Sequence, residues 1–277
     1  MKRILLALCL GSAISGLSAQ TLRTPSPSPG QTIKQDFGLS SIELSYSRPG
    51  VKNRKIFGDV RPYGVIWRTG ANGATTLTFD DDVTIGGTSI KAGKYGLLTI
   101  PDKENWIVII TKQLDVTSPD AYKKEEDLVR LNVKPVMLKE PVETFGMQFI
   151  NIKPNSCDLQ LLWENTSVSF AITTDIDTKV TKQISEIMNT DNRPYYNAAM
   201  YYMDNGKDLN QALTWFDKAL EQNQNAFFIL YQKAVCQSKL GKKEDAKATA
   251  LKAIDAAKAA KNDDYVKLNE KLITSLK

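Results

Sequence analysis

The chain has 277 residues, enough for two domains of ordinary size. Apolar residues make up 42% and charged residues 24%, as in soluble globular proteins, so the composition excludes wholesale disorder and a multi-span membrane protein. The sequence contains no histidine, which excludes a Ser-His-Asp triad, a Cys-His dyad and a histidine-rich zinc site.

Residues 1–19 have the layout of a secretory signal peptide. Lys2 and Arg3 precede an apolar run over residues 4–10, and small residues follow up to Ala19. We therefore expect cleavage near Ala19 and export to the periplasm or the extracellular space. Because no later stretch has the ~18 apolar residues of a spanning helix, we expect no membrane span.

The charges and cysteines outside the expected signal peptide bear on two questions, nucleic-acid binding and disulfide formation. Without Lys2 and Arg3 the net charge falls from +5 to +3, and residues 20–190 hold equal numbers of basic and acidic side chains. This balance predicts that nucleic acid is not a partner. Cys157 and Cys236 each lie in an apolar pattern, which predicts two buried free thiols rather than a disulfide.

The next part of the chain has the period of β-strands. Residues 20–32, rich in Pro and Ser, predict an extended lead segment. From 33 to 175, short alternating runs without intervening helices predict an antiparallel β-sandwich of the jelly-roll kind. Gly86-Gly87 predicts a tight hairpin between two runs. Residues 157–163 and 168–172 are expected to be two strands that face each other across a turn at Glu164-Asn165.

Past residue 175 the period becomes 3.6, which makes the expected fold α+β with two domains. Apolar residues between Val180 and Met188 predict a linking helix within residues 176–190. Residues 191–277 contain a repeat at a shift of 34 residues, with Ala212, Phe216 and Ala219 recurring as Ala246, Ala250 and Ala253. Such a helix–turn–helix period is typical of tetratricopeptide repeats, and a generic helical bundle is the alternative. So short an array is expected to dock on the β domain or on a protein partner.

A basic segment stands out in the β half. Residues 48–68 hold six basic side chains and one acid, Asp59, with aromatic residues interleaved. Arginine forks beside aromatic rings suit carboxylate, sulfate, phosphate or sugar groups. The candidate ligand-binding residues are Arg48, Tyr63, Trp67, Arg68 and Asn72.

Several motifs in and after this segment resemble one bacterial family. They are Arg48-Pro49, Arg54-Lys55-Ile56-Phe57-Gly58, Pro62-Tyr63-Gly64, Trp67-Arg68-Thr69-Gly70-Ala71-Asn72 and Ala92-Gly93-Lys94-Tyr95. Together they resemble domain of unknown function 2911 over roughly residues 30–173. The resemblance implies an exported β-rich domain, and it implies no reaction and no catalytic residues. Asn53 stands where glycine is expected, and because asparagine tolerates positive φ we expect the turn to be kept.

The candidate residues also have a structural interpretation. Trp67 fits a core position, and Asn72 fits a turn. Arg48 and Arg68 can pair with Asp59 or with backbone carbonyls of the loops.

The functional hypothesis is an exported, non-catalytic binding protein. Its β domain would hold an anionic or carbohydrate-like ligand, and its helical repeats would contact a protein, with no cofactor, metal or catalytic residue assigned. One alternative is a glycan-acting hydrolase, which needs two carboxyl groups about 5–10 Å apart. The other is a purely structural envelope scaffold.

Overall fold

The computed structural model describes residues 24–188 and 193–276. The chain divides into two compact units, with the boundary between Asp175 and Ile176. The expected signal peptide, residues 1–19, lies outside the described residues. Within the described part, no helix combines the length and the apolar character needed to cross a membrane.

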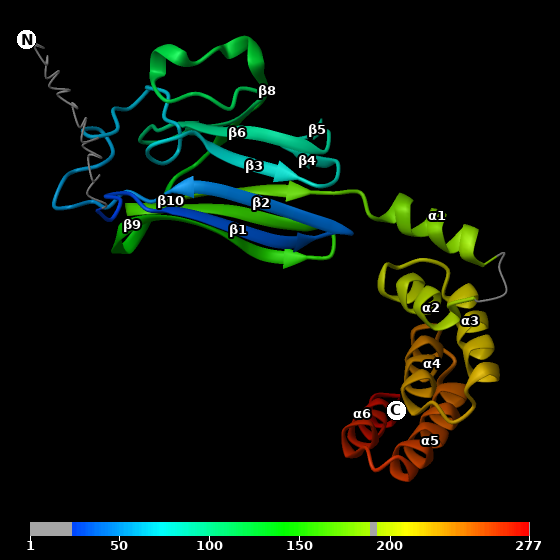
Figure 1. Ribbon diagram of the computed structural model, residues 1–277. Helices are drawn as coiled ribbons and strands as arrows, with labels where there is room; N and C mark the ends of the chain where they lie inside the picture. Colours follow the sequence, from blue (N-terminus) through cyan, green and yellow to red (C-terminus); the bar gives the residue numbers. More distant parts are fainter. Residues whose placement is uncertain (1–23, 189–192, 277) are drawn as a thin grey trace, which may run out of the picture. The chain divides into compact units, whose positions relative to one another are not determined.

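The first unit is built from antiparallel strands (Figure 1). In chain order they are β1 Gly30–Phe37, β2 Ser40–Ser47, β3 Thr75–Phe79, β4 Val83–Ile85, β5 Thr88–Ile90, β6 Gly93–Ile100, β7 Trp106–Thr111, β8 Asp127–Val133, β9 Val136–Lys153 and β10 Ser156–Thr173. Two short 3-10 helices, η1 Pro119–Ala121 and η2 Lys124–Glu126, lie between β7 and β8.

These strands form two sheets around one core. One sheet has the order β1-β2-β3-β6-β7-β8, and the other has the order β5-β4-β10-β9. Alternation in sequence becomes alternation in burial: Leu44 of β2 pairs with Leu77 of β3, and both are fully buried. The same hydrophobic core contains Leu159 and Ile172 from the second sheet. The expected antiparallel β architecture is confirmed.

Gly86 and Gly87 form the expected tight turn. Their φ angles are +58° and +81°, and Ile85 of β4 pairs with Thr88 of β5 on either side of them. Residues with a Cβ rarely adopt positive φ at two consecutive positions, which explains the Gly-Gly pair.

The expectation of two strands over residues 157–163 and 168–172 is wrong. Both runs belong to the single strand β10, which pairs with β9 along most of its length. Glu164 has a φ of +51°, and the register against β9 shifts on either side of it. An irregularity of this kind bends a strand and changes its register without ending it. Leu159, Leu161 and Trp163 therefore share a strand with Val168, Phe170 and Ile172 and do not face them.

The second unit is helical. Its elements are α1 Asp177–Ile187, α2 Tyr195–Asp204, α3 Leu209–Gln222, α4 Phe227–Lys239, α5 Lys243–Ala259 and α6 Asp263–Ser275. Gly206 and Gly241 have φ values of +65° and +74° between successive helices. Antiparallel sheets followed by six helices in the described residues confirm the α+β class. The repeated positions are buried in both places: Ala212, Phe216, Ala219, Ala246, Ala250 and Ala253.

Both cysteines of the described residues are buried and free, as expected from their apolar surroundings. Burial raises the pKa of the Cys157 thiol to about 11, and Asp158 adds to the effect. Burial also raises the pKa of the Cys236 thiol. Neither thiol has the depressed pKa of a reactive nucleophile.

Candidate functional site

The connection between β2 and β3, residues 48–74, carries the basic segment and is held to both sheets. The N–H of Val51 donates to the carbonyl of Glu143 in β9 at 2.8 Å. Further along, Trp67 and Thr99 of β6 exchange main-chain hydrogen bonds of 2.7 and 2.9 Å. Because the connection is attached at both places, its side chains occupy defined positions. Asn53, at the position where glycine was expected, has a φ of +57° and keeps the turn.

Trp67 lies in the core of the β unit. Its side chain is 3% exposed, and its ring stacks on Trp163 with 5.6 Å between centroids. Phe145 is 5.1 Å away by the same measure, and the indole Nε1 donates to the carbonyl of Gly70 at 2.9 Å. Trp67 therefore acts as a packing residue, although one side of it borders a cavity.

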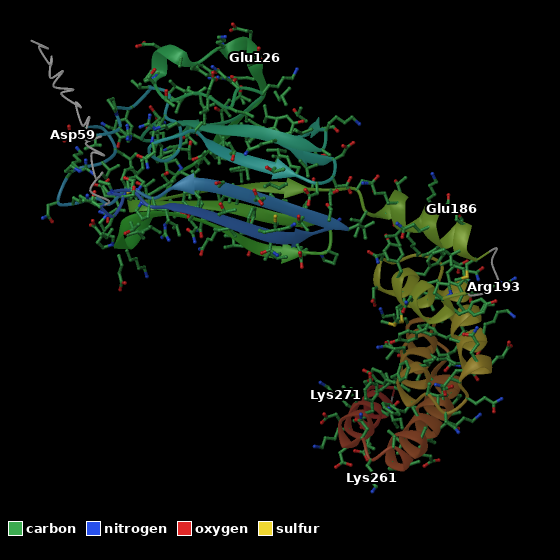
Figure 2. The ribbon with its side chains drawn as sticks, viewed as in Figure 1. Asp59, Glu126, Glu186, Arg193, Lys261 and Lys271 are labelled. Carbon is green, nitrogen blue, oxygen red and sulfur yellow. The ribbon has the colours of Figure 1, made fainter. Side chains whose placement is uncertain are left out.

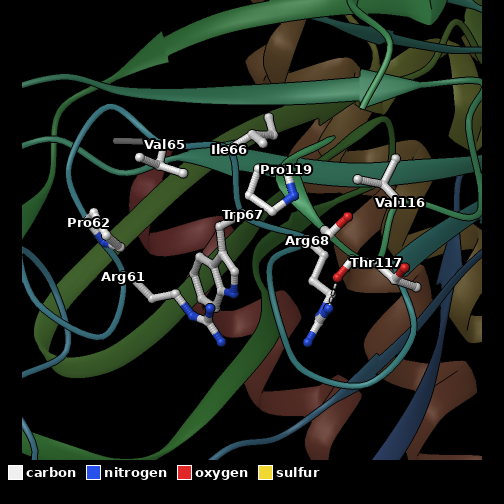
Figure 3. Close-up of a pocket in the computed structure, with 10 residues that line it drawn as sticks. Arg61, Pro62, Val65, Ile66, Trp67, Arg68, Val116, Thr117 and Pro119 are labelled. Carbon is white, nitrogen blue, oxygen red and sulfur yellow. Dashed lines mark hydrogen bonds between the residues drawn. The ribbon is translucent and has the colours of Figure 1, made fainter. Parts of the chain in front are cut away.

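This cavity has a volume of about 260 Å³. Residues 61–62 and 65–68 line one side and residues 116–119, which lead into η1, line the other (Figure 3). The lining side chains are mostly apolar, with Arg61 and Arg68 as the charged groups. A concave space with a few polar groups on an apolar wall is a common form of ligand site.

Arg61 and Arg68 bring two positive charges to this one cavity. The guanidinium carbon of Arg61 is 5.7 Å from the centre of the Trp67 ring, a cation–π distance. Arg68 donates from Nη1 to the carbonyl of Thr117, on the opposite side of the cavity. In both arginines, Nε is buried and lacks a hydrogen-bond partner. Buried donors without partners are uncommon in folded proteins and call for an explanation.

The two arginines also lack a compensating negative charge. Among the described residues, no carboxylate forms an ion pair with Arg61 or Arg68. Burial lowers the pKa of Arg61 first of all, and the charges of Arg68 and Arg54 lower it further. The protein thus holds like charges close together in a partly desolvated environment, where an anion would reduce their repulsion.

Asp59, the acid within the basic run, does not neutralise these charges. It is exposed and forms no ion pair with an arginine of the described residues (Figure 2). Of the structural pairings considered for Arg48 and Arg68, those with backbone carbonyls are present. Arg48 donates from Nε to Phe145 O at 3.0 Å, and Arg68 donates to Thr117 O.

Glu164 of β10 is hydrogen-bonded to the basic segment. Its carboxylate accepts hydrogen bonds from the N–H groups of Ile56 and Phe57, at 3.2 and 3.4 Å. These contacts join the irregular point of β10 to the stretch that leads into Arg61. The sequence predicted a turn at Glu164. It did not indicate the role of Glu164 as an acceptor, because the donor Ile56 lies 108 positions away in the chain.

The structure brings together two of the five candidate residues. Trp67 and Arg68 border the cavity with Arg61. Arg48 borders a different cavity, of about 340 Å³, together with Tyr46 and Gln148.

Tyr63 and Asn72 border neither cavity. Tyr63 packs against the core, and Lys103 Nζ lies 5.9 Å from its ring centre. Asn72 has a φ of +58° and donates from Nδ2 to Ser28 O and Ser47 Oγ. Both therefore have local structural roles.

Sequence reasoning left out two parts of this cavity. Arg61 belongs to the basic run, and its place seven residues before Arg68 was the available signal. Residues 116–119 lie about fifty residues further along the chain, and nothing in their sequence indicates that they meet the basic segment.

The part of the chain that holds this cavity matches a known protein family. The family described as protein of unknown function (DUF2911) matches residues 28–172, which include the cavity and all five candidate residues. No curated protein and no solved structure matches the chain.

Proposed function

Because the chain belongs to the DUF2911 family, whose description assigns no reaction, we propose a function from the site itself. The β unit binds a small anion in the cavity between Arg61 and Arg68. One observation carries this proposal: Arg61 and Arg68 border the same cavity, each has a buried Nε that lacks a partner, and no described carboxylate pairs with either arginine.

The chemistry of the two side chains favours an oxyanion. A guanidinium presents its N–H groups in a planar fork that matches two oxygen atoms of one anion. Arg68 uses Nη1 on Thr117 and retains an unpaired Nε, as Arg61 does. An oxyanion in the cavity would lie beside both guanidinium groups and offset both charges.

A neutral sugar fits this place less well. Sugar rings bind proteins by lying on exposed aromatic faces and by exchanging many hydrogen bonds. Trp67 is 3% exposed and stacked on Trp163, so its face is occupied by the core. Of the two ligand classes expected for this segment, the geometry supports the anionic one.

The glycan hydrolase draws no support from this cavity. It would need a pair of carboxyl groups beside the ligand. The residues that line the cavity include no Asp and no Glu.

We propose that this binding takes place outside the cytosol. The support is the basic start, apolar run and small residues of positions 1–19. We also propose that the two sheets form a β-sandwich, since one core takes side chains from both.

The helices are proposed to be tetratricopeptide-like and to contact a protein partner. Three small or aromatic positions of α3 recur in α5 at a shift of 34 residues, and all are buried between helices.

The test is calorimetric titration of the purified chain with benzoate, glucuronate and sulfate at low ionic strength. We expect at least one of these anions to bind. Arg61→Ala and Arg68→Ala should each weaken that binding about tenfold or more, since each removes a charged donor.

Lys55→Ala is the matched control. Lys55 is exposed, lies in the same basic run and does not border the cavity. Its loss removes the same charge and should change the affinity less than about twofold. Equal effects of Lys55→Ala and the arginine variants would reduce the site to general attraction by the basic run.

A further inference from the structure

The geometry points to one class of anion: a carboxylate joined to a compact apolar group. This inference rests on the proposed function, because it concerns the same cavity. The observation that supports it differs from the one behind the proposed function, because it concerns the apolar residues that line the cavity and not the arginines.

The apolar residues that line the cavity are held by packing. Val116 is buried and packs with Leu98 and Ile109 in a small second core. Ile66 packs partly buried against the same core. These contacts fix the wall, so an apolar group of the ligand would meet a preformed surface.

Val65 is an exposed apolar residue of the cavity lining. Its side chain borders the cavity and is 39% exposed, so an apolar group beside the cavity is left in water. Figure 3 shows Val65 and Ile66 away from the ends of Arg61 and Arg68, whose guanidinium groups lie at the other end of the cluster. The cavity therefore has a basic end and an apolar end.

A polyhydroxylated acid would be poorly matched to this wall. Its hydroxyl groups would need partners, and the polar side chains of the lining other than the arginines are Thr117 and Ser118. The carbonyl of Thr117 already accepts from Arg68. Hydroxyl groups without partners against Val116 and Ile66 would lower affinity, because they lose hydrogen bonds to water.

An inorganic anion would use only half of the site. Sulfate or phosphate can meet the guanidinium groups, but it leaves the apolar wall facing water and gains nothing from it. At about 260 Å³, the cavity lies below the usual range of roughly 300–1,000 Å³ for ligand pockets. This volume suits a compact ligand such as a substituted benzoate or a short branched carboxylate.

The first test compares ligands on the unaltered chain. Benzoate is expected to bind about tenfold more tightly than glucuronate or sulfate, and affinity should rise from acetate to butyrate to cyclohexanecarboxylate. If glucuronate or sulfate binds as tightly as benzoate, and Arg68→Ala weakens that binding, the ligand class proposed here is overturned while the anion site stands. If no probe binds in an arginine-dependent way, the proposed function itself fails.

The second test uses Val65→Ser. This variant should weaken benzoate binding about threefold to tenfold and leave the binding of sulfate unchanged. Leu114→Ser is the control, because Leu114 is 44% exposed and does not border the cavity. Circular dichroism reports whether each variant folds. Equal loss of benzoate and sulfate binding in Val65→Ser would contradict an apolar contact.

Discussion

The hydroxyl of Tyr46 in β2 accepts a 2.8 Å hydrogen bond from the main-chain N–H of Met147 in β9. β2 and β9 belong to different sheets, so a side chain of one sheet satisfies the backbone of an edge strand in the other. The same hydroxyl donates to Gln31 Oε1 at 2.8 Å, and the Tyr46 ring meets that of Phe145 edge-on.

Tyr46→Phe should lower the free energy of unfolding by about 1–3 kcal/mol, because it leaves a buried N–H of Met147 without an acceptor. Urea denaturation followed by tryptophan fluorescence measures this change. Tyr95→Phe is the matched control: its hydroxyl donates to the carbonyl of Lys91 at an exposed site, and its loss should stay within about 0.5 kcal/mol. Similar losses in both variants would contradict the role given to Tyr46.

The stability of the protein should fall at alkaline pH. Burial raises the pKa of Tyr46, and burial together with the hydrogen bond to Asp127 raises the pKa of Tyr122 to about 12. An unfolded tyrosine loses its proton near pH 10. The folded state holds more protons above that pH, so the stabilising contribution is complete below pH ~10 and is lost as pH rises toward the folded pKa values.

Unfolding free energies measured between about pH 9 and pH 11.5 test this dependence, since tyrosine titration in the two states diverges there. Tyr122→Phe should make the decline shallower than in the unaltered chain, because one of the shifted groups is gone. A decline of the same slope would assign the effect to other groups, such as lysines.

Gly58 and Gly64 offer a comparison between strain and steric overlap. Both have positive φ, +90° and +76°. A Cβ at position 58 would lie 2.7 Å from Tyr63 Cε2, whereas a Cβ at position 64 would have no neighbour within 4 Å. Gly64→Ala should lose about 1 kcal/mol from backbone strain alone, and Gly58→Ala should lose more. Thermal denaturation ranks the two, and a larger loss in Gly64→Ala would be the contrary result.

Glu164 should control the order of the basic segment. Glu164→Ala removes the acceptor for the Ile56 and Phe57 amides and should raise their hydrogen exchange, while exchange in β6 stays unchanged. Glu164→Gln keeps one carbonyl oxygen and should give an intermediate rise. Unaltered exchange in Glu164→Ala would show that the other attachments of the loop suffice.

The elements of the fold followed from local pattern. The antiparallel strands and the Gly86-Gly87 hairpin were predictable because alternation and turn chemistry are properties of neighbouring residues. The sequence indicated an irregularity at Glu164 but not its kind, so a turn was predicted where β10 continues with a shift of register. A strand that bends and one that turns back have the same alternation over short runs.

The cavity was less accessible to sequence reasoning than the fold. Composition identified the basic segment, and Trp67 and Arg68 came from it. Composition did not distinguish Arg48 from these two residues, although Arg48 donates to Phe145 O and borders a second cavity. It also gave no sign of the wall around Val116, because that contact joins parts of the chain about fifty residues apart.

Of the described residues, those around the Arg61–Arg68 cavity include no carboxyl, thiol or imidazole group. Arginine keeps its charge in proteins, so the site carries the same charge across about pH 5 to 8. Any variation of affinity within that interval must then originate in the bound molecule. A carboxylate is ionised throughout the interval and should bind with constant affinity, whereas a phosphate monoester, with its second pKa of about 6, should bind with an affinity that changes within it.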